Sequence, residues 1–341
     1  MTVVISCYNY AHYLPQAVQS CISQRDVDVD VIIVDDASTD DSLAVAEGLS
    51  RAHANVAVVT HSQNKGMVET FNDGAKVATG EFLVRLDADD LLTPGSLSRA
   101  TLVAQNCPSV GLVYGHPIHF STESPPVSHV IPSLWTIWPG LNWLSDRCRS
   151  GQNVITSPEA LMRRSVVESI GYQANLRHTP DMEFWLRMSA FADVAYIHGA
   201  DQAWHRDHPD SMSAREVDGV NDLGERLEAF EALFGGVAGR VSGTSGLLGV
   251  AKRALVREAL FTAGLELDRG LRHPELMDAY LSFARQVNPG VENSTEWTHL
   301  STRADRATSG SQWRPSSVVR RVHSRVRSEL TWYRWRRNGV F

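Results

Sequence analysis

The chain has 341 residues, of which 43% are hydrophobic, enough for a folded protein with a full core. Its formal net charge of −7 argues against nucleic-acid binding, because proteins that hold phosphate backbones cluster Lys and Arg. The four cysteines stand far apart without a CxxC pair, so we expect reduced core thiols and neither a zinc site of that type nor a redox dithiol.

No targeting or membrane segment is evident in the sequence. Met1 is followed by the apolar run Val3-Val4-Ile5, without the charged segment and cleavage site of a signal peptide. No stretch approaches the roughly 20 apolar residues that a transmembrane helix needs. We therefore expect a cytoplasmic protein, at most attached to a membrane surface.

The first 90 residues predict strands and helices in alternation. Short β-branched runs predict strands at 3–7, 29–34, 56–60 and 81–86, and apolar residues at helical spacing predict helices around 14–22, 41–52 and 67–78. Alternation of this kind predicts an α/β fold, a mostly parallel sheet with helices on both faces. Ligands of such sheets bind beyond the carboxyl ends of the strands.

The middle of the chain is less regular. A Pro-, Ser- and Trp-rich stretch at about 116–140 predicts a long loop, and Trp135, Trp138 and Trp143 in or beside it either stack on a ring of a bound ligand or pack inside. After it we predict the following elements: a strand near 153–162, a helix at about 180–191 and a strand near 194–198.

Beyond Ser213 helical patterns dominate. They cover 222–234, 248–268 and 274–286, with a Gly-rich connector in between. We therefore place a domain boundary near residue 215, which separates a catalytic domain at 1–215 from a helical region at 216–341.

The segment 314–341 differs in charge from the rest. It holds eight of the 32 basic and one of the 39 acidic side chains, so residues 1–313 carry 24 basic and 38 acidic groups, a balance of −14. Arginines beside Trp332, Tyr333 and Trp335 suit an anionic membrane surface. The alternative, which we favour, is a helix docked on the acidic body of its own subunit or of a partner in a homodimer.

Polar residues follow the predicted strands. Ser6-Cys7-Tyr8-Asn9 stands at the end of the first, Asp35-Asp36-Ala37-Ser38-Thr39-Asp40 at the end of the second, and Asp87-Ala88-Asp89-Asp90 at the end of the fourth. Asn64-Lys65-Gly66 and Asn72-Asp73-Gly74 lie between the second and the third of these segments. With its motifs in this order, the sequence resembles glycosyltransferase family 2 over about residues 2–215. The resemblance implies a GT-A fold with a Rossmann-like nucleotide-binding half, here followed by a C-terminal helical extension.

A nucleotide-sugar donor needs contacts to its base and its diphosphate. A carboxylate after the second strand can accept the N3–H of uracil, and Asp35 and Asp36 are both placed for this, although Asp and Ser here also suit a helix N-cap. Tyr8 can cover the base. The residues expected to bind the donor are Ser6, Tyr8, Asn9, Asp35, Asp36, Lys65, Arg85, Asp87, Ala88 and Arg206.

The Asp87-Ala88-Asp89 triplet predicts a cation site. Residues i and i+2 of a strand point to the same side, and Mn²⁺ or Mg²⁺ prefers carboxylate and phosphate oxygens. In the segment 205–213, which looks like a family element that closes over the donor, His208 is a further candidate ligand and Arg206 a candidate diphosphate contact. A solvated turn at the triplet and a structural His208 are the alternatives.

The helix that begins at Pro180 carries the candidate catalytic base. In the family an acidic pair opens this helix, and its second carboxylate, the base, matches Asp181; Pro180 stands where the first acid is usual. Stabilisation of the helix dipole, worth ~0.3–1 kcal/mol, is the structural alternative. Glu183 is the second candidate for the base.

The predicted function is inverting transfer of a sugar from a UDP- or dTDP-linked donor to an acceptor hydroxyl. The QxxRW element of processive polysaccharide synthases is absent, so we expect single additions. A sugar nucleotidyltransferase is disfavoured because no Gly-rich, Arg-containing loop follows the first strand. The remaining alternative is a catalytically silent module that binds a nucleotide sugar or glycan.

Overall fold

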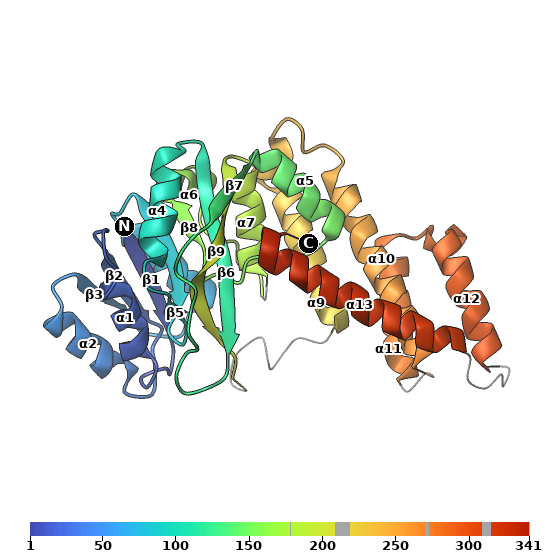
Figure 1. The fold of residues 1–341 in the computed structure, drawn as a ribbon, viewed down its shortest axis with the longest axis horizontal. Helices are drawn as coiled ribbons and strands as arrows, with labels where there is room; N and C mark the ends of the chain where they lie inside the picture. The colour runs from blue at the N-terminus through green and yellow to red at the C-terminus, as the bar shows by residue number, and fades with distance from the viewer. Residues whose placement is uncertain (178, 209–218, 270–272, 309–314, 341) are drawn as a thin grey trace.

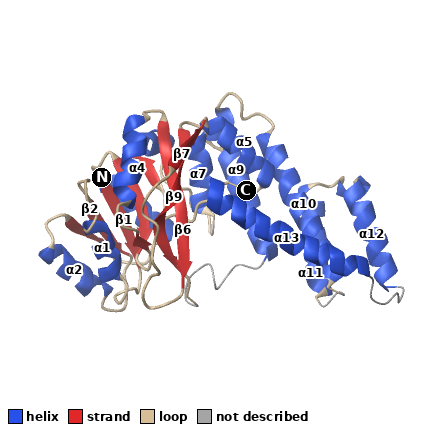
Figure 2. Ribbon diagram, viewed as in Figure 1, coloured by secondary structure: helices blue, strands red, loops and turns tan. Residues whose placement is uncertain are grey.

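A computed structural model describes residues 1–177, 179–208, 219–269, 273–308 and 315–340. The predicted boundary near residue 215 lies outside these ranges. The described chain forms one sheet covered on both faces by helices, with further helices beyond it (Figures 1 and 2). The predicted α/β fold class is confirmed.

The N-terminal half of the sheet follows the predicted alternation closely. Its strands are β1 (Thr2–Cys7), β2 (Asp30–Asp35), β3 (Val56–Thr60) and β4 (Phe82–Asp87). The helices between them are α1 (Leu14–Ile22), α2 (Ser42–Ala52) and α3 (Met67–Val77). All four strands are parallel, in the order β3-β2-β1-β4.

The second half of the sheet is mixed. Its strands are β5 (Leu91–Leu92), β6 (Val110–Phe120), β7 (Leu134–Trp138), β8 (Leu161–Arg163) and β9 (Asp193–Arg206). The helices that accompany them are α4 (Ser96–Asn106), α5 (Gly140–Ser150), α6 (Arg164–Ile170) and α7 (Pro180–Ser189). The sheet continues from β4 through β8, β6 and β9 to β5, and β7 pairs with β9.

Strand direction decides where the site forms. β8 runs antiparallel to both β4 and β6, and β6 runs parallel to β9, so β6 and β9 point the same way as β4. The carboxyl ends of β1, β2, β4, β6 and β9 therefore lie along one edge. Ligands of open α/β sheets bind at this edge.

Two predictions for the middle of the chain were wrong in part. The loop expected at 116–140 is confined to 121–133, because 116–120 belongs to β6 and 134–138 to β7, and the expected strand near 153–162 is reduced to β8. Both errors arise from pairing between strands distant in sequence, since β6 and β7 pair with β9, and β8 pairs with β4 and β6. Trp143 is buried on α5, whereas Trp135 on β7 is about half exposed.

Alternating residues of the strands fill a core on each face of the sheet. On β1, Val3 and Ile5 pack with α1 and α4, whereas Val4 packs on the opposite face with α3. The second core continues through α5 and α7 into the C-terminal helices. The helical region thus shares a core with the sheet.

The C-terminal region consists of helices, as predicted. They are α9 (Gly219–Gly235), α10 (Leu247–Asp268), α11 (Pro274–Val287), α12 (Thr295–Thr308) and α13 (Pro315–Asn338), with 3-10 turns at Val237–Arg240 and Val291–Asn293. Helix α13 runs back across the molecule and ends beside the sheet (Figure 1). No helix among the described residues combines the length and apolarity of a membrane span.

The end of α13 docks on the body of the same chain. Trp335 is buried and its indole N–H donates to Val154 O at 3.0 Å, while the Tyr114 hydroxyl donates to Gly339 O at 2.7 Å. Gly339 adopts a φ of +72°, and a Cβ there would lie 2.3 Å from the Tyr196 ring. Docking is therefore seen for this end of the tail, and membrane contact and a homodimer stay predictions.

Gly74 sets how closely α3 approaches the sheet. A Cβ at this position would lie 2.4 Å from Val4 Cγ1 and 2.9 Å from Val34 Cγ2. Because both valines are stiff and buried, we expect Gly74→Ala to lower the free energy of unfolding by about 1–3 kcal/mol in urea denaturation, despite better helix propensity.

Gly48 on α2 is the matched control. No atom lies within 4 Å of a Cβ built there, so Gly48→Ala should raise the free energy of unfolding by about 0.5–1 kcal/mol. Equal effects of the two changes would contradict close packing at Gly74.

Candidate active site

The register of β1 with its neighbours places the two acidic motifs side by side. Cys7 pairs with Asp35 on β2, and Ser6 pairs with Asp87 on β4. The backbone continues this pairing beyond the strands, because Asp36 N–H donates to Cys7 O and Ala88 N–H donates to Ser6 O. The Ser6 hydroxyl and Ala88 are buried, so these two residues contribute backbone structure at this edge.

The loop after β1 is held by the loop after β2. Asn9 has a positive φ of 59°, and its side-chain oxygen accepts hydrogen bonds from Thr39 N–H at 2.8 Å and Asp40 N–H at 3.3 Å. Ser38 Oγ accepts from the backbone N–H of Asn9 at 3.0 Å. Tyr8 beside it is 45% exposed. Of these two residues predicted to bind the donor, Asn9 therefore orders the loops, and Tyr8 is accessible to a ligand.

The two carboxylates after β2 have different environments. Asp36 accepts from the backbone N–H groups of Lys65 and Gly66, both at 2.8 Å, and lies 2.7 Å from His61 Nδ1. Although burial opposes it, these donors lower the pKa of Asp36. Asp35 accepts from Ser38 N–H at 3.2 Å, and its other oxygen is buried without a protein partner.

A charge network extends from Asp36 to α3. His61 Nε2 lies 3.2 Å from Asp73 Oδ2, within ion-pair distance but without hydrogen-bond geometry. The Lys65 and Lys76 ammonium groups each donate to Asp73 at 2.8 Å, and they lower the pKa of Asp73 to about 2. Lys65, a predicted donor residue, therefore already has an acidic partner.

Asp87 turns toward Arg85. The guanidinium NH2 lies 3.3 Å from both Asp87 oxygens, and Arg85 NH1 donates to Gln173 Oε1 at 3.4 Å. The contact follows from strand geometry, because residues i and i+2 of β4 lie on the same side. Arg85 is buried, so its charge stays beneath the site and orients Asp87.

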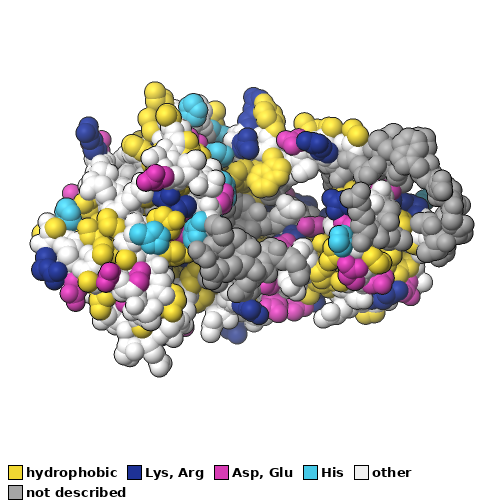
Figure 3. Space-filling model, turned by 90° about the horizontal axis from the view of Figure 1, so that it is seen from below, with side chains coloured by type: hydrophobic (Ala, Val, Ile, Leu, Met, Phe, Trp, Pro, Cys, Tyr) yellow, Lys and Arg dark blue, Asp and Glu magenta, His cyan; other side chains and the backbone are white. Residues whose placement is uncertain are grey.

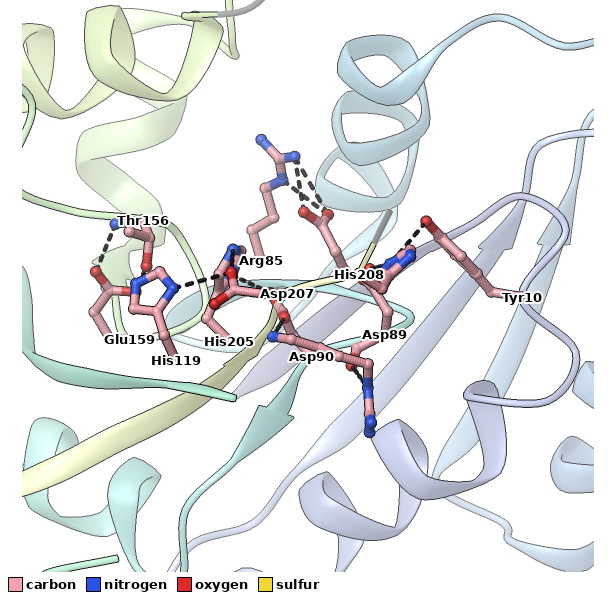
Figure 4. A network of polar contacts seen from close by, with 12 residues as sticks. Tyr10, Arg85, Asp89, Asp90, His119, Thr156, Glu159, His205, Asp207 and His208 are labelled. Carbon is pink, nitrogen blue, oxygen red and sulfur yellow. Dashed lines mark hydrogen bonds and ion pairs between the residues drawn. The ribbon is translucent and has the colours of Figure 1, made fainter. Parts of the chain in front are cut away.

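Asp89 instead contacts His208. His208 Nε2 lies 2.8 Å from Asp89 Oδ2 and 3.4 Å from the Tyr10 hydroxyl (Figure 4). Burial first, and then the charges of Asp90 and Asp87, raise the pKa of Asp89 to about 6. The predicted metal set is therefore assembled in part, with Asp89 and His208 in contact and Asp87 held by Arg85.

Arg206 differs most from its predicted role. Its guanidinium is buried 4.5 Å from the ring centres of both Tyr13 and Phe120, and it donates to Asp89 O and Gln16 Oε1 at 2.9 Å. Instead of reaching toward a diphosphate, it clamps the backbone of the acidic turn. A buried cation needs such partners, and the loop carbonyl supplies one.

Asp181 lies in the first turn of α7, as predicted. Its Oδ2 accepts from the Asn153 amide at 3.3 Å. Burial raises the pKa of Asp181, while the nearby charge of Arg85 opposes the shift and that of Asp87 adds to it. Phe184, Trp185 and Met188 are buried, as expected, and so is every other residue of α7 except Asp181.

Residues 2–171 match the family model described as glycosyl transferase family 2. The chain belongs to this family. An uncharacterized glycosyltransferase from Nostoc sp. is 39% identical over 114 residues, which are 33% of this chain and 35% of that protein. Chondroitin synthase from Escherichia coli is 31% identical over 97 residues, 28% of this chain and 14% of that protein. The alignments thus span about a third or less of these curated relatives.

A solved structure extends the likeness to the fold. A fragment of TarS from S. aureus in complex with UDP-GlcNAc has a TM-score of 0.57 at 17% identity, covering 88% of this chain and 78% of that one. At this identity the likeness shows the fold alone, which is of the GT-A type. It covers more of the chain than the family match, including part of the C-terminal helical region.

Several residues that contact the predicted site residues were missed by sequence reasoning. His61 directly follows β3, so the rule that strand ends face the ligand would have found it. Asp90 belongs to the acidic motif, and its buried carboxylate accepts from Arg206 N–H at 2.8 Å. Asn153 lies in an irregular segment, and no local pattern indicates it.

Glu183, the second candidate for the base, is occupied elsewhere. Its two oxygens accept from Arg187 Nε at 2.9 Å and NH2 at 3.0 Å, and both side chains are buried. Since removal of one partner leaves a buried charge, we expect Glu183→Gln to lower the free energy of unfolding by about 3–5 kcal/mol, measured in denaturant.

The matched control is Glu47→Gln, which breaks an exposed 3.5 Å contact with Arg51 at the same i,i+4 spacing. It should change stability by less than about 0.5 kcal/mol. A Glu183→Gln protein of wild-type stability but without activity would contradict the structural role.

Proposed function

We propose that this chain transfers a sugar from a UDP- or dTDP-linked donor to an acceptor hydroxyl, with inversion at the anomeric carbon and a divalent cation bound. The observation that carries the proposal is that three carboxylates at one edge of the sheet have different environments. Hydrogen-bond donors lower the pKa of Asp36, Asp89 lies 2.8 Å from His208, and burial raises the pKa of Asp181. The complex of TarS with UDP-GlcNAc supports a UDP-linked donor.

Asp36 is the proposed contact for the base. Three hydrogen-bonding groups of the chain fix its carboxylate and favour the ionised form, which accepts from the N3–H of uracil or thymine. Asp35 instead orders the turn before α2 through Ser38. The exposed Tyr8 ring at the end of β1 is suited to stack on the base.

Asp89 and His208 are the proposed ligands of Mn²⁺ or Mg²⁺. Their chemistry fits, because burial and then the charges of Asp90 and Asp87 raise the pKa of Asp89 to about 6, and a bound cation would offset the repulsion between these carboxylates. Bound there, the cation supplies charge neutralisation for the leaving diphosphate. Asp87, steadied by Arg85, is left for the ribose or for water molecules of the cation.

Asp181 is the proposed general base. Its ionised carboxylate takes the proton of the acceptor hydroxyl while that oxygen attacks the anomeric carbon, and the nucleoside diphosphate leaves from the opposite side. The raised pKa improves the match to this proton transfer, and the Asn153 amide orients the carboxylate. Direct displacement needs no covalent sugar intermediate.

The cation prediction is tested by release of free nucleoside diphosphate from donor and acceptor. Excess chelator should abolish turnover, and Asp89→Asn should weaken donor binding only when Mn²⁺ or Mg²⁺ is present. Asp146→Asn, which changes an exposed acid on α5, is the control and should behave as wild type. Full turnover in chelator would refute the cation requirement.

The base prediction is tested by Asp181→Asn. The change keeps the shape of the side chain and should lower kcat by about 10²–10⁴-fold while donor affinity stays the same. In the wild type, turnover should fall as the pH drops through the raised pKa of Asp181, because only the ionised carboxylate accepts a proton. A variant that keeps more than about one-tenth of the wild-type kcat would exclude Asp181 as the base.

Asn153→Ala gives a graded control for the same assignment. It retains Asp181 but removes the donor to Oδ2, so the ionised form loses a hydrogen bond. The acid limb of the pH profile should therefore move to higher pH, with the rate at high pH much less affected than in Asp181→Asn.

A further inference from the structure

Two histidines and an aspartate gather at the ends of β6 and β9, outside the Asp89–His208 pair. Among the described residues, His119, His205 and Asp207 can place one nitrogen or oxygen each within 4.8 Å of one another. Figure 4 shows the three side chains together, and the view from below in Figure 3 shows histidines beside acidic side chains at the surface. The donor site described above does not use this group.

The strands hold the group on a rigid frame. His119 and His205 are paired residues in the parallel register of β6 and β9. Asp207 follows β9 directly, and its backbone N–H donates to Phe120 O at 2.8 Å, which continues the pairing. The three side chains thus start from ordered positions, as a metal site requires.

Their distances fit one small cation. Asp207 Oδ1 lies 3.2 Å from His119 Nδ1 and 4.0 Å from His205 Nε2. The centroids of the two imidazole rings are 4.8 Å apart. Ligands bound to Zn²⁺ at about 2.0–2.2 Å lie about 3–4 Å from one another. Small side-chain rotations would therefore complete the coordination.

A buried carboxylate orients one of the histidines. Asp90 Oδ2 lies 3.1 Å from His205 Nδ1, and Asp90 is 1% exposed. A carboxylate on one ring nitrogen, with the other nitrogen directed at the ion, is the usual support of a metal-bound histidine. Here it leaves His205 Nε2 facing Asp207.

The local charge also favours a cation. Asp90 Oδ2 and Asp207 Oδ1 lie 3.1 Å and 4.0 Å from the two ring nitrogens of His205. These carboxylates attract a dication to the group. The side chains of His119 and Asp207 are about half exposed, so an ion can enter from solvent.

We propose that His119, His205 and Asp207 form a second cation site, which binds a transition metal such as Zn²⁺. Two imidazoles and one carboxylate select a metal of this class over Mg²⁺. Three protein ligands leave a fourth position open. The bound ion would link the ends of β6 and β9. Its ligands His205 and Asp207 directly precede Arg206 and His208, which both contact Asp89.

The test is calorimetric titration of the full chain with Zn²⁺ in an excess of Mg²⁺. We expect one equivalent of Zn²⁺ to bind, and His119→Ala and Asp207→Asn each to weaken binding about tenfold or more. Circular dichroism and thermal melting verify that each variant is folded. Co²⁺ provides a second readout, because its visible absorption reports imidazole ligation and should be lost in His119→Ala.

Two controls separate this site from others. His273→Ala removes an exposed histidine at the start of α11 and should bind Zn²⁺ like wild type. Asp89→Asn, which impairs the proposed donor cation, should also retain Zn²⁺ binding, so failure of one site is distinguishable from failure of the other. Unchanged Zn²⁺ affinity in His119→Ala, or complete displacement of Zn²⁺ by Mg²⁺, would overturn the proposal.

Discussion

The parallel pairing of β1 with β2 and β4 is the constraint on which the rest of the site depends. It aligns Cys7 with Asp35 and Ser6 with Asp87, so two acidic turns leave the sheet next to each other. Strands β6 and β9 run in the same direction and bring His119, His205 and His208 to this edge. The proposed base contact, cation ligands and second cation site all lie along it.

The many carboxylates along this edge repel one another, and each has different partners in the fold. Asp36 and Asp73 receive hydrogen-bond donors and are kept ionised. Asp90 is buried against His205 and the backbone of Arg206. Asp89 and Asp181 keep raised pKa values, and these are the two positions to which we assign cation binding and proton transfer.

Cations of the chain lie beneath this edge and act as supports. Arg85 orients Asp87, and Arg206 holds the backbone oxygen of Asp89 from between two aromatic rings. The C-terminal helix contributes from farther away. Trp335 donates to the carbonyl of Val154, the residue after the Asn153 that contacts Asp181. The helical region therefore helps to position the candidate base as well as to cover the sheet.

The sequence by itself determined the features that depend on local patterns. The β-branched runs placed β1 to β4, the polar residues at their ends marked the edge, and Pro180 with its apolar stripe placed α7 and Asp181. Each of these signals lies within a dozen residues, so no knowledge of distant contacts was needed.

Only the tertiary structure decided how the side chains are used. The partners of Arg206 come from α1, the acidic turn and β6, and Asp181 meets Asn153 across a gap of 28 positions. The two ends of the loop expected at 116–140 joined the sheet because β6 and β7 pair with β9, far along the chain. The His119–His205 pair has the same origin, since burial and cross-strand register are set by residues distant in sequence, and no local pattern carries them.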